Sequence, residues 1–337
     1  MYTRRTIRWS IIGLYAWKYI LFFLLYSAAI VFAHCRLQWH FLQIPFMPIS
    51  AIGIAVAFYI GFKNNSSYDR LWEARRIWGA LVNSSRTFAI QVLDFVNNKK
   101  AQESCGTIEL EEIHRRLIYR HLAFLNALRL QLRRPTYWEQ AYKAGQMLVE
   151  HEDEFHMDSM DKELQKFIPI EEVQQYVANR NAATQIIRKQ SQELQELFDE
   201  GMLDSFHHVE MTRTLAEFYN QQGGAERIKN FPFQRQYAYF SFVFVWIFIL
   251  LLPLGLVAEF GKLGENYEWL VIPFHTLICW VYNTMEIVGT SSENPFENSI
   301  NDVPITSICK TIEIDLREML GETDLPEKPV PVHDILM

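Results

Sequence analysis

The chain has 337 residues, of which 32 are Lys or Arg and 39 are Asp or Glu, so its formal net charge is −7. This mildly acidic balance argues against a dedicated nucleic-acid-binding protein, whose domains usually carry a basic excess. The charges are unevenly distributed, because the first acidic residue is Asp69 and the 68 residues before it hold only six charges, all basic. This separation of apolar and charged segments argues against an ordinary soluble enzyme.

Four stretches with little or no charge are candidates for membrane-spanning helices. They lie at 18–36, 36–63, 235–259 and 269–285. A bilayer core requires about 20 apolar residues in helical form, so the first three are long enough, and the fourth is shorter and more polar. The pattern predicts an all-α membrane protein with four transmembrane helices per chain.

The basic residues predict how the chain is oriented. Most of them lie at the N-terminus and in the segment between the second and third spans, and such residues favour the cytoplasmic side. We therefore predict a multi-pass inner-membrane protein with both termini in the cytoplasm. The expected parts are residues 1–62 with the second membrane helix at about 46–62, which continues into the cytoplasm, then a helical cytoplasmic domain at 63–235, two membrane helices at 236–288, and a cytoplasmic C-terminal segment at 289–337.

The sequence of the cytoplasmic segment predicts helices. Apolar residues recur with a helical period in 69–96, 108–132 and 171–199. Two segments are predicted to be loops, the acidic stretch 150–163 and the stretch 219–235 around Gly223–Gly224. A solvated acidic surface is favoured over a cation site at 150–163, because its acidic residues lack the regular spacing of a calcium loop.

Catalytic and metal-binding patterns are missing from the sequence. It contains no G-x-G-x-x-G, no G-x-S-x-G and no H-E-x-x-H motif. The four cysteines, Cys35, Cys105, Cys279 and Cys309, form no C-x-x-C pair and indicate neither a disulfide framework nor a zinc site. We therefore expect no enzymatic activity, no cofactor and no bound metal.

The second span contains two adjacent stripes of residues spaced four apart. One stripe consists of Gly53, Ala57 and Gly61, and small residues let membrane helices approach closely. The other consists of Ser50, Ile54 and Phe58. A ring of Ile and Phe side chains around an axis forms a hydrophobic constriction that can gate by dewetting. The pattern by itself favours the simpler interpretation, in which Ile54 and Phe58 face lipid or protein.

Four motifs carry a resemblance to a known family. They are N-N-S-S-Y-D-R-L-W-E-A-R-R-I-W-G at 64–79, E-R-I at 226–228 followed by Pro232, L-P-L-G at 252–255, and N-P-F at 294–296. They occur in the family's order and within the predicted topology, over about residues 5–305. On these motifs the chain resembles the bestrophin family, in its bacterial branch.

The resemblance implies a homopentameric ion channel that passively conducts small monovalent ions through one axial pore. It assigns Ser50, Ile54 and Phe58 to three rings in a neck and, from less distinctive sequence, Ile168 to a second, cytoplasmic aperture. The family often has a bulky apolar residue where Ser50 stands, so the outermost ring is expected to be wider or wetter here. The resemblance reverses the simpler interpretation of Ile54 and Phe58.

Calcium gating is not expected. Animal bestrophins carry a dense acidic run after their N-P-F motif, which forms a calcium clasp. Here residues 297–304 contain only two acids, Glu297 and Asp302. Calcium prefers several oxygen ligands, usually including carboxylates.

The sequence leaves the choice between chloride-like anions and sodium-like cations open. Asp69 and Glu73, just inside the predicted neck, would favour cations, whereas Arg70, Arg75 and Arg76 would favour anions. The acidic net charge slightly favours selectivity for cations. Family members described as chloride channels argue the other way.

Two other functions compete with a channel. One is a membrane-anchored helical scaffold or sensor that binds a cytoplasmic partner of undefined identity. The other is an alternating-access carrier, for which the inverted repeats common in such proteins are not evident.

Overall fold

The structure is a computed structural model that describes residues 1–6, 9–98, 107–136, 159–299 and 301–336. Across these residues it contains helices and no strand beyond isolated bridges near the two ends of the chain. The predicted all-α class is confirmed. Two compact units form, and each is described separately. We call them the apolar unit, residues 4–71 and 232–294, and the charged unit, residues 1–3, 72–231 and 295–337.

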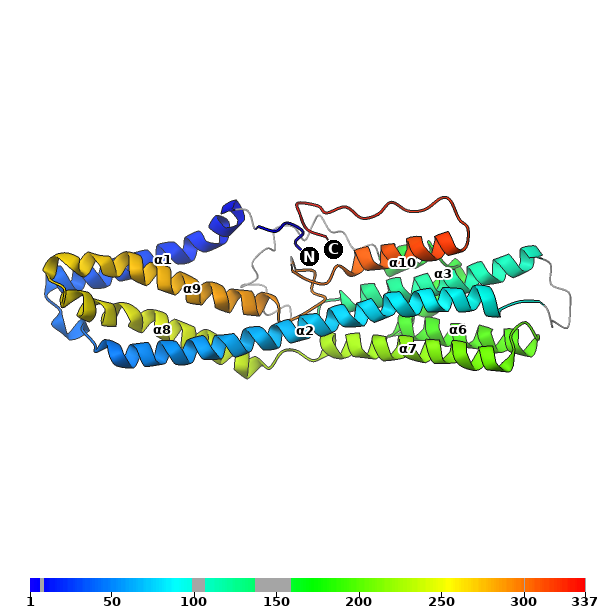
Figure 1. The fold of residues 1–337 in the computed structure, drawn as a ribbon, viewed down its shortest axis with the longest axis horizontal. Helices are drawn as coiled ribbons and strands as arrows, with labels where there is room; N and C mark the ends of the chain where they lie inside the picture. Colours follow the sequence, from blue (N-terminus) through cyan, green and yellow to red (C-terminus); the bar gives the residue numbers. More distant parts are fainter. Residues whose placement is uncertain (7–8, 99–106, 137–158, 300, 337) are drawn as a thin grey trace. The chain divides into compact units, whose positions relative to one another are not determined.

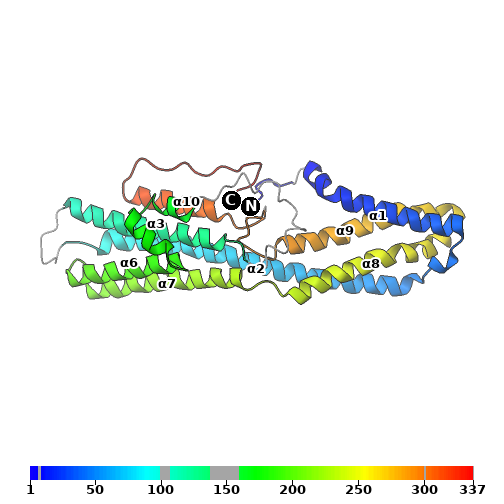
Figure 2. The ribbon, with the colours of Figure 1, turned by 180° about the vertical axis from the view of Figure 1, so that it is seen from behind.

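The apolar unit is built from long and largely apolar helices, whose course is drawn in Figures 1 and 2. Among the described residues, four helices are long and apolar enough to cross a membrane: α1 (Trp9–Leu37), α2 (Phe46–Phe95), α8 (Arg235–Gly261) and α9 (Val271–Ser291). Short 3-10 turns, η1 (His40–Leu42) and η4 (Glu265–Leu270), lie between them in the chain. α2 crosses the predicted domain boundary at 62–63 without a break and supplies residues to both units.

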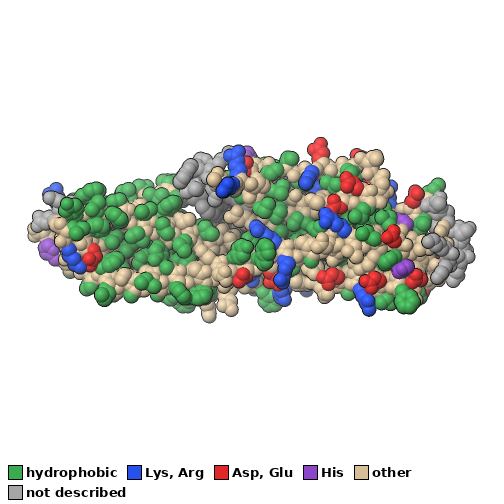
Figure 3. All heavy atoms as spheres, in the orientation of Figure 1, with side chains coloured by type: hydrophobic (Ala, Val, Ile, Leu, Met, Phe, Trp, Pro, Cys, Tyr) green, Lys and Arg blue, Asp and Glu red, His purple; other side chains and the backbone are tan. Residues whose placement is uncertain are grey.

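Buried apolar side chains from all four apolar helices form the core of this unit. Phe23 of α1, Ile60 of α2, Ile249 of α8 and Cys279 of α9 are each fully buried in it. The outer surface of the unit is also hydrophobic, as Figure 3 shows over α1 and α9. Large exposed apolar surfaces mark contacts with a membrane or with other protein chains, which fits the predicted membrane location.

In its described residues, the charged unit combines the second part of α2 with six further helices. These are α3 (Thr107–Leu132), α4 (Met160–Leu164), α5 (Ile170–Val177), α6 (Ala182–Asp199), α7 (Ser205–Asn230) and α10 (Ile305–Met319). α3 packs against α6 and α10, and α6 packs against α7. Acidic and basic side chains gather on its surface (Figure 3).

One buried ion network stabilises the centre of the charged unit. Arg120 of α3 is almost fully buried and pairs with Glu172 of α5 at 3.1 Å and with Glu193 of α6. A buried guanidinium needs such partners because an unpaired buried charge is strongly destabilising. The network therefore ties three helices together.

Two local predictions were wrong. The predicted helix 171–199 is two helices, because the side-chain oxygen of Asn181 accepts a hydrogen bond from the backbone N–H of Thr184 at 3.0 Å and begins α6 anew. The predicted loop 219–235 is helical as far as Asn230. A Cβ atom on Gly224 would lie 3.1 Å from Cδ1 of Ile77, so this glycine allows α7 to approach α2.

Candidate functional site

α2 presents two different faces along its part in the apolar unit. Buried side chains recur every three or four residues at Val56, Ile60 and Lys63. This spacing follows the helical repeat of about 3.6 residues per turn, so one face packs against the other apolar helices. The opposite face carries the residues predicted to line a neck.

Large apolar side chains line this opposite face and are exposed in the single subunit. Ile54 is 71% exposed and Phe58 is 68% exposed. Phe62 is exposed one turn further on, and its ring centroid lies 5.0 Å from that of Phe58 in an edge-to-face arrangement. Ser50 is half-buried, and its hydroxyl donates a hydrogen bond to the carbonyl oxygen of Met47 at 2.8 Å. We call the row formed by Ile54, Phe58 and Phe62 the α2 stripe.

The three small residues predicted to pack helices together have different environments. A Cβ atom on buried Gly53 would lie 2.7 Å from Cε2 of Phe248 in α8. Ala57 is half-buried, and Gly61 is exposed, with no atom within 4 Å of such a Cβ. Residues four apart drift by about 40° around a helix, which explains the change. Close packing of Ala57 and Gly61 against another subunit stays a prediction.

Polar residues follow the α2 stripe on the same face. Asn65 and Asp69 are both exposed, and Nδ2 of Asn65 lies 3.5 Å from Oδ2 of Asp69. They share the direction of Phe58 because seven and eleven residues make about two and three helical turns. Arg70 has a different contact, since its Nε donates a hydrogen bond to the carbonyl oxygen of Glu293 at 2.8 Å. Of these two adjacent charges, Asp69 is the one on the face of the α2 stripe.

A buried polar cluster holds the packed face of α2. The ammonium group of Lys63 lies 2.5 Å from Oε1 of Glu286 and donates a 2.8 Å hydrogen bond to Oγ1 of Thr290, both in α9. Ser241 of α8 donates a 2.6 Å hydrogen bond to the other carboxylate oxygen of Glu286. This cluster joins three helices and was missed in the sequence. The available signal was Glu286, an acidic residue directly after an apolar span, where ionisable groups are usually functional or paired.

The other predicted inner-mouth charges belong to the charged unit. Glu73 forms an ion pair with Arg227 of α7. Arg75 is half-buried and Arg76 is exposed. The predicted charges therefore differ in partner and exposure and do not act as one group.

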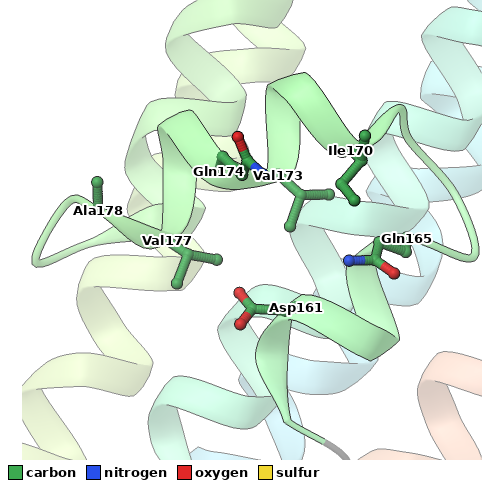
Figure 4. Close-up of a pocket in the computed structure, with 7 residues that line it drawn as sticks. All are labelled: Asp161, Gln165, Ile170, Val173, Gln174, Val177 and Ala178. Atoms are coloured by element: carbon green, nitrogen blue, oxygen red, sulfur yellow. The ribbon is translucent and has the colours of Figure 1, made fainter.

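The residue predicted to form a second aperture, Ile168, is 6% exposed and packs inside the charged unit. Its assignment to a cytoplasmic aperture stays a prediction. Phe206, the second residue of α7, is 86% exposed, more than any other large apolar residue described. Ile170 is also exposed and borders a shallow groove between α4 and α5 (Figure 4).

The segment after α9 closes on the carboxylate of Asp302. This buried group accepts hydrogen bonds from the backbone N–H groups of Phe296 and Asn298 at 2.9 Å each and of Val303 at 2.6 Å. Both carboxylate oxygens thus accept hydrogen bonds from backbone N–H groups. In the part of the chain that the structure describes, no cluster of three or more His, Cys, Asp or Glu is arranged to hold a metal.

Most of the predicted acidic loop 150–163 lies outside the described residues. In its described part, Glu163 forms an ion pair with Arg129 at 2.9 Å and contacts Lys166. These pairs partly neutralise the acidic segment.

The fold and this site define a class of protein: a helical membrane protein whose second apolar helix exposes an apolar row followed by polar residues. Residues 4–318 match the family model described as bacterial and fungal bestrophin protein, and the chain belongs to this family. A protein of Ralstonia nicotianae is 27% identical over 83% of this chain and 79% of its own length. A protein of Salmonella typhi is 27% identical over 93% and 89%. Both are named voltage-dependent anion channel-forming proteins.

A solved structure shows the same fold. The crystal structure of a bacterial bestrophin homologue from Klebsiella pneumoniae is 24% identical and covers 90% of this chain and 98% of its own, with a TM-score of 0.74. The predicted family is confirmed. Membership in it identifies the chain as a membrane protein of the channel class and not as an enzyme.

Proposed function

We propose that the chain assembles as a homopentamer around one axial pore in the inner membrane and passively conducts small monovalent ions. The observation that carries this proposal is the uncovered α2 stripe, which continues into polar residues while the opposite face of α2 is fixed by a buried ion pair. The names of the curated relatives support channel formation. The basic residues of the cytoplasmic segment support an orientation with both termini in the cytoplasm.

Five copies of α2 around an axis would turn the α2 stripe into a neck. Rings of Ile54 and Phe58 exclude water when narrow, and such a constriction gates by dewetting. Ser50 stands one turn before Ile54 and adds a hydroxyl to the outermost ring, which makes this ring easier to wet. The backbone amides around Asp302 argue against gating by calcium at that segment.

We infer that the pore prefers monovalent cations. Asp69 shares the exposed face with Phe58, whereas the guanidinium of Arg70 is engaged by the Glu293 carbonyl. A ring of carboxylates concentrates cations near the pore mouth. Anion conduction is the second candidate, supported by the names of the relatives and by exposed Arg76.

The reversal potential under a salt gradient tests this selectivity. In a planar bilayer, the wild-type protein is expected to reverse on the cation side. Asp69→Asn removes the ring charge and should reduce the cation-to-anion permeability ratio about threefold, equivalent to ~0.7 kcal/mol. Glu73→Gln is the matched control, because Arg227 already neutralises Glu73. If the reversal potential of the wild-type protein lies on the anion side, the channel function is retained and the cation preference is rejected.

We further propose that Phe206, rather than Ile168, narrows the ion path in the charged unit. Phe206→Ala removes an exposed ring and is expected to raise conductance while changing the free energy of unfolding by less than about 0.5 kcal/mol. Ile168→Ala empties a buried position and should cost about 2–5 kcal/mol. Thermal unfolding and single-channel conductance of both variants distinguish the roles. A stable Ile168→Ala protein with raised conductance would restore the original assignment.

A membrane-anchored scaffold is the alternative that one observation favours. The groove between α4 and α5 is bordered by exposed Ile170 and by Val173 and Val177 (Figure 4), a surface on which a partner helix could dock. A folded wild-type protein that carries no current in any salt would support this alternative.

A further inference from the structure

Glu293 follows α9 directly and has an unusual environment. Its side chain is only 7% exposed within the apolar unit. Its Oε2 atom has no hydrogen-bond partner among the residues that the structure describes. By contrast, both carboxylate oxygens of buried Glu286 are bonded, one by Lys63 and one by Ser241. An ionised carboxylate left without partners in a buried site is unstable, so Glu293 is suited to holding a proton.

Charged groups on three helices act on Glu293. Lys63 and Arg70 belong to α2, Arg235 to α8, and Glu286 to α9. The pKa of Glu293 is raised from 4.5 to about 7, because burial and the nearby Glu286 raise it by more than the three cations lower it. The carboxyl group thus titrates near neutral pH, among cations that its ionised form would attract.

Contacts from the end of α9 and from Glu293 hold α2, the helix that carries the α2 stripe. Segment 286–293 holds Lys63 through Glu286 and Thr290 and holds Arg70 through the Glu293 carbonyl. A Cβ atom on Gly289 would overlap Oδ1 of Asn64, so α9 and α2 are in direct contact here. A rearrangement of these contacts therefore acts directly on α2.

We propose that Glu293 is a proton-binding residue whose ionisation shifts the anchoring of α2 and thereby changes ion conduction. When Glu293 loses its proton, its unpartnered oxygen attracts the ammonium of Lys63 and the guanidinium of Arg70. The carboxylate then competes with Glu286 for Lys63, and the contacts of α2 with α9 are redistributed. The inference rests on the proposed channel function, and the tests below separate the two.

The sign of the effect on stability follows from the raised pKa. Because the folded protein binds this proton more tightly than the unfolded chain, the free energy of unfolding falls as pH rises from about 4.5 to about 7 and is level above. Glu293→Gln cannot ionise. The part of the pH dependence due to Glu293 is therefore the difference between the wild-type and Glu293→Gln unfolding curves.

Single-channel recording tests the coupling to conduction. Currents of the wild-type protein are expected to titrate with a midpoint near pH 7. Glu293→Gln should lose this titration and behave at about pH 8 as the wild-type protein does at about pH 6, one unit on either side of the midpoint. Glu318→Gln, a change at an exposed acid of α10, is the control and should titrate like the wild-type protein. A Glu293→Gln protein that keeps the wild-type titration would overturn the proposal.

Infrared difference spectroscopy detects the protonation state of Glu293 and does not require an ion current. A carboxylic acid band should disappear between about pH 6 and pH 8 in the wild-type protein and be absent from Glu293→Gln. If the wild-type protein conducts but lacks this band, the proton site is rejected and the proposed channel function is retained. If the wild-type protein shows this band but carries no current, the proton site is supported and the proposed channel function is rejected. The band together with pH-independent currents would reject the coupling to conduction.

Discussion

Replacing Phe58 with alanine is expected to increase the single-channel conductance of the protein. Phe58 is 68% exposed in its own subunit, so removing its ring leaves no internal cavity and the subunit stays folded. Five missing rings would widen the proposed neck and let water enter it, which lowers the barrier for an ion. A barrier lower by about 1.4 kcal/mol gives about a tenfold increase, and we expect that order of effect. Ile54→Ala, with a smaller side chain lost, should give a smaller increase.

Planar-bilayer recordings of purified protein check this result. Phe242→Ala is the matched control, because Phe242 of α8 is also exposed, at 51%, but lies on a different helix. Its conductance should equal that of the wild-type protein. If Phe58→Ala and Phe242→Ala both conduct like the wild-type protein, the α2 stripe does not form the neck. If no variant conducts, the scaffold becomes the better explanation.

The four apolar helices could be predicted because the absence of charge over some twenty residues is a local property of the sequence. Helix period likewise indicated α3 and the continuation of α2 past the membrane. The break at Asn181 was missed because one capping hydrogen bond outweighs a periodic apolar pattern. The glycines at 223–224 were misread as a loop, since their role depends on the approach of another helix.

The candidate site was only partly predictable for the same reason. Spacing identified Ser50, Ile54 and Phe58 as a stripe, but which of the neighbouring charges shares its face depends on distant contacts. Arg70 is engaged by the carbonyl of Glu293, which is 223 residues away in the chain. The burial of Ile168 could likewise not be predicted, because the packing of the charged unit decides whether an apolar residue is buried or exposed. A single sequence does not reveal such long-range contacts.

The buried Lys63–Glu286 pair is expected to dominate the stability of the apolar unit. Lys63→Met keeps the length and apolar stem of the side chain but leaves the carboxylate of Glu286 buried, with Ser241 as its remaining donor. Removing one partner of a buried ion pair costs about 3–5 kcal/mol. Thermal or denaturant unfolding in detergent should show this loss. Lys262→Met, which breaks an exposed pair of similar length with Glu259, should cost less than about 1 kcal/mol.

A double variant distinguishes an unpaired charge from lost packing. Lys63→Met combined with Glu286→Leu removes both charges, and replacing a buried pair by apolar groups is often neutral or stabilising. We therefore expect the double variant to be more stable than Lys63→Met alone, with a non-additive coupling of about 2 kcal/mol or more. Additive losses would mean that Lys63 and Glu286 contribute independently and not as an ion pair. In that case the pair would not anchor α2, and the contacts of α2 with α8 at Gly53 would have to hold the helix instead.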